Sequence, residues 1–119
     1  MQNFRDLKVW SKAHGVALSI YAATETFPPT ERYGLTSQMR RAATSIPSNI
    51  AEGCGRSSNA DLARFLHIAF GSASELEYLL LLSRDLEFLE ASAHDTMVPD
   101  VQEVKRMLTS LIARVKSDD

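Results

Sequence analysis

The sequence has one cysteine, five glycines and four prolines among 119 residues, and no long apolar run. The single Cys54 excludes an intramolecular disulfide and therefore a disulfide-stapled scaffold. No run approaches the about 20 apolar residues that a membrane-spanning helix requires. The N-terminal stretch carries charges throughout and lacks the uninterrupted apolar core of a signal peptide. These absences predict a cytoplasmic protein without a membrane span.

An excess of charge of one sign is also missing. The chain has 13 basic and 15 acidic residues, which gives a net charge of −2. A dedicated nucleic-acid-binding protein is usually more basic, so any such contact has to depend on a local patch. The composition, 45% apolar and 24% charged, is typical of a globular protein. The length suits one domain that spans residues 1–119.

Strand signals are absent as well: no stretch alternates for long between apolar and polar residues, and no Asn-Gly turn occurs. Four segments instead repeat apolar residues with helical spacing. They run from about Asp6 to Phe27, from Leu35 to the "GCGR" stretch, from Ser58 or Asn59 to about Leu89, and from the "SAHDTMVPD" stretch past Val115. Short connections join antiparallel neighbours in helical bundles. The sequence therefore predicts an all-α, antiparallel, up-down-up-down four-helix bundle.

The same periodicity predicts a core with one anchor from each helix. We expect the side chains of Trp10, Ile46, Leu76 and Leu108 to be mostly buried. The fourth segment adds a regular heptad seam, formed by Val101, Val104, Leu108, Leu111 and Val115. Gly53 or Gly55 can take the left-handed conformation that closes a helix, at the end of the second helix.

Pro47 lies inside the apolar stripe of the second helix, which continues to Ile50. Proline removes a backbone donor and crowds the preceding turn, so we expect a kink near Pro47. Ser45, Ser48 and Asn49 can hydrogen-bond the backbone groups that the kink frees. A polar stripe runs beside the apolar face, and it is either a solvated or subunit-facing seam or a ligand or RNA site. Its members are Gln38, Arg41, Ser45, Asn49 and Glu52.

Four successive leucines, Leu79 to Leu82, cover all sides of the third helix. A bundle seam buries only part of a helix circumference, so at least one of them should point away from the core. That leucine is either a single exposed side chain or part of an oligomer interface. The small residues of "AFGSAS", Ala69 to Ser74, allow another helix to approach closely, within the bundle or between subunits.

Three blocks of the sequence resemble one family. They are "FRDLKVW", "YGLTSQMRRAATSIPSNIAEGCGR" and "FLHIAFGSASELEYLLLLSRDL". In this order they are similar to the four-helix-bundle proteins encoded in intervening sequences of bacterial 23S ribosomal RNA genes. The resemblance implies a left-handed bundle that assembles into a homopentameric ring. It also implies a relationship to accessory proteins of diversity-generating retroelements, which bind nucleic acid through basic surfaces. No enzymatic activity carries over from the family.

Patterns that would indicate catalysis are missing. None of His14, His67 and His94 follows a glutamate by three residues, as a di-iron bundle site requires. Glu75 and Glu77 lie about 200° apart on a helix and cannot act as an acid–base pair from one face. The sequence predicts no catalytic, cofactor or metal site and no small-molecule substrate. Three functions are considered: an RNA-binding assembly module, a scaffold that binds a protein partner without nucleic acid, and, least favoured, an enzyme.

Four arginines are the candidate nucleic-acid contacts: Arg40, Arg41, Arg56 and Arg64. In one chain they are either solvated surface charges or a basic patch. A ring would repeat the patch around one face, and arginine suits phosphate because its planar fork donates two hydrogen bonds. No exposed aromatic platform is evident, so we expect binding of structured RNA by shape and charge, with little base preference.

Overall fold

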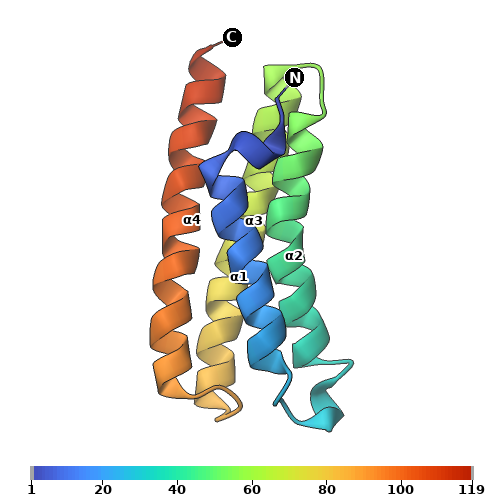
Figure 1. Ribbon diagram of the computed structural model, residues 1–119, viewed down its shortest axis with the longest axis vertical. Coiled ribbons are helices and arrows are strands. Elements are labelled where there is room, and N and C mark those ends of the chain that lie inside the picture. The colour runs from blue at the N-terminus through green and yellow to red at the C-terminus, as the bar shows by residue number, and fades with distance from the viewer. Residues whose placement is uncertain (1, 119) are drawn as a thin grey trace.

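The computed structural model describes residues 2–118, and these residues form four long helices and two short 3-10 turns (Figure 1). The elements are η1 (Phe4–Asp6), α1 (Lys8–Thr24), η2 (Pro29–Glu31), α2 (Leu35–Cys54), α3 (Asn59–Asp85) and α4 (Ala91–Ser117). The predicted all-α fold is confirmed.

Successive helices run in opposite directions along a bundle of 46 × 24 × 19 Å (Figure 1). Each helix packs against its neighbours in sequence and α1 also packs against α4, so α1 and α3 lie on diagonally opposite sides. Both chain ends and the α2–α3 connection lie at one end of the bundle, which we call the terminal end (Figure 1). The α1–α2 and α3–α4 connections lie at the other, opposite end.

The four predicted core anchors are mostly buried, as expected, and Ile46, Leu76 and Leu108 are fully buried. All five residues of the predicted seam in α4 are buried too. Trp10 is less deeply buried than the other three anchors and packs against the edge of the core. Val9 takes the inward position at the start of α1, and the Trp10 ring lies at the bundle edge against Phe4, with ring centroids 4.8 Å apart.

Helix α2 continues through Pro47, whose ring is buried in the bundle. The missing donor and the ring clash bend a helix at such a position, so the cause of the predicted kink is in place. Asn49 donates from its side chain to the Ser45 carbonyl at 2.8 Å and to the Ser45 hydroxyl at 2.9 Å. A polar side chain thus contacts the backbone beside the proline, although not at the Ala43 carbonyl, whose donor Pro47 removes.

The expectation that a left-handed glycine ends α2 is wrong. Gly55, which follows the last residue of the helix, has a φ of −82°, and no described glycine has a positive φ. Gly53 lies inside the helix, where a Cβ atom would stand 2.9 Å from Phe65 Cβ and 3.0 Å from Leu62 Cδ1. The absence of a side chain at Gly53 is thus required by the close approach of α3.

The four leucines of α3 divide as the circumference argument predicts. Leu79 and Leu80 are buried, Leu82 is half-buried, and Leu81 points outward with 38% of its surface exposed. By length and composition alone α3 could cross a membrane. A core helix has the same composition, and ten residues of α3 are buried between its neighbours.

Candidate nucleic-acid interface

Arg40 connects α2 to α1. Its Nε donates to Thr24 Oγ1 at 2.9 Å, and its Nη2 donates to the Tyr21 carbonyl at 3.3 Å. The guanidinium also lies over the Tyr21 ring, 4.5 Å from its centroid, and 3.6 Å from Glu25 Oε1. The side chain is consequently held by one helix, and an acid partly neutralises its charge.

Arg41 is exposed on the other side of α2, and Figure 1 places its helix beside α3. Its Nη1 donates to Ser37 Oγ at 2.7 Å, and among residues 2–118 it makes no ion pair. The arginine borders a shallow groove between α2 and α3. The other lining residues are Gln38, Ala42, Ser45, Ser72 and Glu75.

This groove is the polar seam between α2 and α3. Gln38 Nε2 donates to Glu75 Oε2 at 3.2 Å, and the Ser45 and Ser72 hydroxyls lie 2.8 Å apart. Two members of the polar stripe predicted from the sequence, Gln38 and Ser45, therefore contact α3 within one chain.

Arg56 and Arg64 share one aromatic side chain at the terminal end. Their guanidinium carbons lie 4.8 and 4.5 Å from the centroid of the Phe65 ring. Arg56 Nη2 is 2.8 Å from Glu52 Oε2, and Arg64 Nε is 3.6 Å from Asp61 Oδ1. Both arginines are exposed, so these ion pairs are open to solvent and weak.

Within one chain the four predicted arginines lie in three places. Arg40 faces α1, Arg41 faces the α2–α3 groove, and Arg56 lies with Arg64 at the terminal end. Three of the four have an acidic partner. A single chain does not unite them in one patch.

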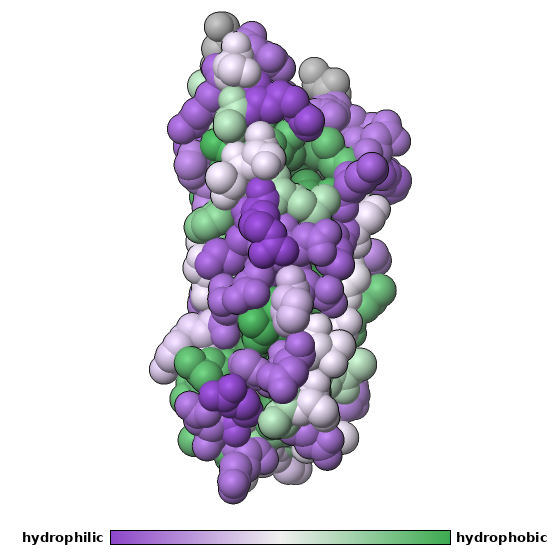
Figure 2. All heavy atoms as spheres, turned by 90° about the vertical axis from the view of Figure 1, so that its left-hand side faces the viewer, coloured by the Kyte–Doolittle hydropathy of each residue, from purple (hydrophilic) through white to green (hydrophobic). Residues whose placement is uncertain are grey.

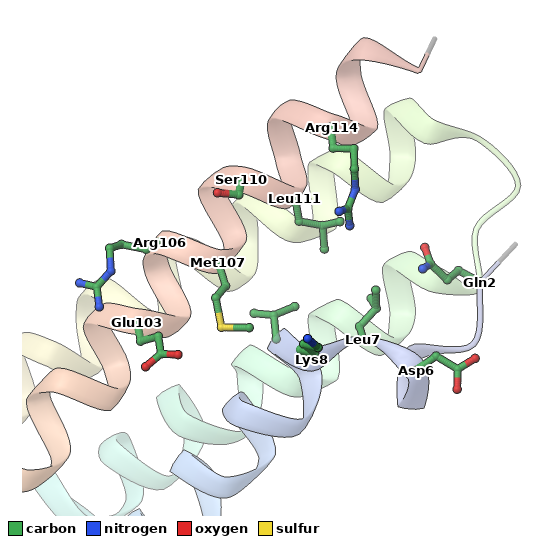
Figure 3. A pocket seen from close by; sticks show the side chains of 11 residues that line it. Gln2, Asp6, Leu7, Lys8, Glu103, Arg106, Met107, Ser110, Leu111 and Arg114 are labelled. Atoms are coloured by element: carbon green, nitrogen blue, oxygen red, sulfur yellow. The ribbon is translucent and has the colours of Figure 1, made fainter.

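A second set of cations, missed by the sequence reasoning, lines a groove of about 560 Å³ between the N-terminal segment and α4 (Figure 3). Lys8 contributes from the start of α1, and Arg106 and Arg114 contribute from α4. None of the three forms an ion pair within the described part of the chain. The signal in the sequence was the cluster of four basic residues between 105 and 116, in the last part of the fourth predicted helix.

The charges of the whole molecule separate along its long axis when each helix is divided at its midpoint. Residues 2–16, 45–72 and 104–118, the terminal half, hold nine basic and four acidic side chains, a net charge of +5. Residues 17–44 and 73–103, the opposite half, hold four basic and ten acidic side chains, a net charge of −6. A nearly neutral chain thus has one basic end.

Two other cations form ion pairs between helices. Lys12 Nζ on α1 lies 3.1 Å from Asp100 Oδ1 and 3.5 Å from Glu103 Oε2 on α4, and the hydrogen bond to Asp100 raises the pKa of Lys12. Lys105 Nζ lies 3.1 Å from Glu77 Oε1 on α3. These pairs bridge neighbouring helices.

Side chains that could do chemistry are separated or buried. Cys54 is 2% exposed, and burial raises the pKa of its thiol, which disfavours the nucleophilic thiolate. The His14 ring stacks on Trp10 at 5.1 Å, and His94 Nδ1 lies 3.1 Å from Asp95 Oδ1. Across residues 2–118, no three His, Cys, Asp or Glu side chains converge to hold a metal ion.

Comparisons with known proteins place this chain in a family. Residues 5–110 match the family described as 23S rRNA-intervening sequence protein. A crystal structure of a protein of unknown function from the S23 ribosomal protein family of Bacteroides thetaiotaomicron VPI-5482 is similar, with a TM-score of 0.81 and 28% sequence identity. The match covers 88% of this chain and 95% of that one. No curated protein sequence matches. Because the family match spans most of the chain, the protein belongs to the 23S rRNA-intervening sequence proteins, a family of unknown function that the three sequence blocks had indicated.

Proposed function

We propose that this protein is a non-catalytic, cytoplasmic, homo-oligomeric module that binds structured RNA through its basic end. The observation that carries the proposal is the charge separation, a net +5 on the terminal half of a chain whose total charge is −2. Phosphate contacts supply most of the sequence-independent affinity for nucleic acid. A localised basic end can therefore bind RNA although the whole chain is slightly acidic.

Exposed apolar side chains on opposite sides of the bundle support the assembly. Leu18 and Tyr21 on α1 are 59% and 44% exposed, and Tyr78 and Leu81 on α3 are 58% and 38% exposed. Since α1 and α3 are diagonal, a contact between α1 of one copy and α3 of the next is head-to-tail, and such contacts form a ring when the rotation between copies closes. A pentamer is the ring that the family resemblance implies.

All four apolar side chains belong to the opposite half of the bundle. A contact between them sets neighbouring bundles side by side and pointing the same way, so that every terminal end lies on one face of the ring. Arg56 and Arg64, two of the arginines proposed as RNA contacts, lie in the terminal half and are then repeated around that face. Arg40 and Arg41, the other two, lie in the opposite half, and the Arg40 guanidinium is engaged by α1.

A binding titration with a structured RNA hairpin at low and moderate salt tests the function. Affinity should fall steeply with salt for the wild-type protein, and the Arg56→Gln/Arg64→Gln variant, which removes two charges from the basic end, should bind more weakly. Arg41→Gln tests the predicted contact outside the basic end, and it leaves the link between Arg40 and α1 intact. Absence of salt-dependent binding would overturn the proposal and favour a scaffold that binds a protein partner through the same apolar faces.

Light scattering coupled to size exclusion tests the assembly separately. About five chain masses are expected for the pentamer. A monomer at micromolar concentration would contradict the ring, and an even-numbered assembly would contradict the pentamer alone.

A further inference from the structure

We propose that the groove between the N-terminal segment and α4, lined by Lys8, Arg106 and Arg114, is the main phosphate-binding site of this protein. In this inference, which rests on the proposed function, RNA approaches the terminal end across the groove and not along α2. The ligand class is the phosphodiester backbone of a nucleic acid.

The groove exists because its two walls differ in length. Helix α1 begins only at Lys8, whereas α4 continues to Ser117. The chain before α1 folds into η1 and crosses toward α2. There the backbone N–H of Gln2 donates to the Cys54 carbonyl at 3.3 Å. The last turns of α4 therefore have no full helix beside them on this side, and Figure 3 shows the open space that remains.

The floor of the groove is apolar and its border is charged. Leu7, Val9 and Leu111 are almost fully buried beneath it, and Met107 is half-buried. Figure 2 looks onto the α4 side and shows hydrophobic atoms in a hollow near the terminal end, bordered by hydrophilic ones. Such a floor accepts the sugar or base of a nucleotide while the border holds its phosphates.

The cations of the groove make no ion pair with an acid in the described part of the chain, whereas most of the predicted arginines do. Glu103 also lines the groove, and its Oε2 is already paired with Lys12 Nζ at 3.5 Å. Asp6 is the other acid of the lining, and it forms no ion pair among the described residues. A phosphate that binds Arg106 or Arg114 displaces no carboxylate, whereas one that binds Arg56 or Arg64 competes with Glu52 or Asp61.

Helix stability does not explain all three cations. Arg114 lies in the last turn of α4, where a positive charge complements the helix dipole. Arg106, however, lies in the middle of α4, and Lys8 is the first residue of α1, where a cation opposes the dipole. A bound anion would offset the unfavourable position of Lys8.

The distribution of charge favours a long polyanion over a short acidic peptide. Arg106 and Arg114 are separated by about 12 Å along α4. Further cations continue beyond the groove around the terminal end, on other elements: Arg5, Arg56, Arg64 and Lys116. Only a ligand longer than the groove contacts cations on both sides of this end.

The test compares two double variants that each remove two positive charges from the full-length protein. Arg106→Gln/Arg114→Gln changes the groove, and Arg32→Gln/Arg84→Gln changes the opposite half. With an RNA hairpin at low salt, the groove variant should bind at least about tenfold more weakly, and its log–log salt slope should fall by about two, since each phosphate contact contributes about 0.9. The control should stay within about twofold of the wild type, since its two arginines lie outside the basic end.

Each outcome separates this inference from the proposed function. If the wild type binds RNA and Arg56→Gln/Arg64→Gln weakens binding while the groove variant matches the control, the groove assignment is wrong and the function stands. If the wild type shows no salt-dependent binding, both fail. If the groove variant instead loses a salt-sensitive self-association, measured by sedimentation, the groove holds the acidic end of a second copy and the inference is overturned.

Discussion

The α2–α3 seam and the α1–α4 seam of this bundle are built in different ways. Between α2 and α3, small residues bring the backbones together: Gly53 leaves no room for a Cβ, and Ala69 and Ala73 are fully buried. Between α1 and α4, long side chains bridge the gap, as Lys12 does to Asp100. The close seam is a structural joint, and the open one leaves a groove with charges available to a ligand.

The sharpest test of the comparison removes one apolar side chain from the bundle core and one from the border of the groove. Leu76→Ala should lower the free energy of unfolding by about 2–5 kcal/mol, since Leu76 is fully buried and its removal leaves a cavity. Met107→Ala should cost about 1 kcal/mol, because half-buried Met107 borders the groove and its removal opens space that solvent already reaches. Denaturant midpoints measure both. Equal losses would mean that the α1–α4 seam is as closely packed as the core.

A second test uses two glycines in helices. Gly53→Ala should destabilise the protein by about 1–3 kcal/mol through overpacking, because its Cβ would meet Phe65 Cβ at 2.9 Å. Gly71→Ala is the matched control: its Cβ would meet nothing within 4 Å, so the higher helix propensity of alanine should stabilise a single bundle by up to about 1 kcal/mol. Thermal unfolding shows whether each substitution lowers or raises the stability of the protein. A destabilising Gly71→Ala that also lowers the mass of the assembly would place Gly71 in the subunit contact.

The smallest expected effect concerns the charged contact between α3 and α4. The hydrogen bond from Gln102 Nε2 (3.1 Å), with the nearby Lys105 ammonium, lowers the pKa of Glu77 below its ordinary value. A lowered folded-state pKa stabilises the protein above the unfolded pKa of about 4.3, and this contribution is lost as the pH falls through the folded value.

Glu77→Gln should therefore reduce stability at pH 7 by about 0.5–1 kcal/mol and by less at pH 3. Unfolding curves at the two pH values, with Glu87→Gln as the control, measure the difference. An equal loss at both pH values would show that the charge of Glu77 does not matter.

Much of the fold was predictable because helical periodicity is a local property. The apolar spacing located all four helices, and the seam from Val101 to Val115 is buried as predicted. The depth of burial was less predictable, because Val9 and Trp10 are adjacent and both suit an apolar stripe, and only the direction from which α4 and α2 approach makes Val9 the more deeply buried. The left-handed glycine was misassigned for a similar reason, since a glycine required by a neighbouring helix looks in sequence like one required by its own backbone.

The candidate site was less predictable than the fold. The sequence alone determined the number and order of helices, the antiparallel path and the apolar faces, because spacing and short connections depend only on neighbours along the chain. Tertiary structure decided which cations are available: it tied Arg40 to α1, set Arg56 and Arg64 beside acids, and left Lys8, Arg106 and Arg114 around one groove. Ion pairs and grooves form between residues far apart in sequence, so only the packing of the four helices fixes them.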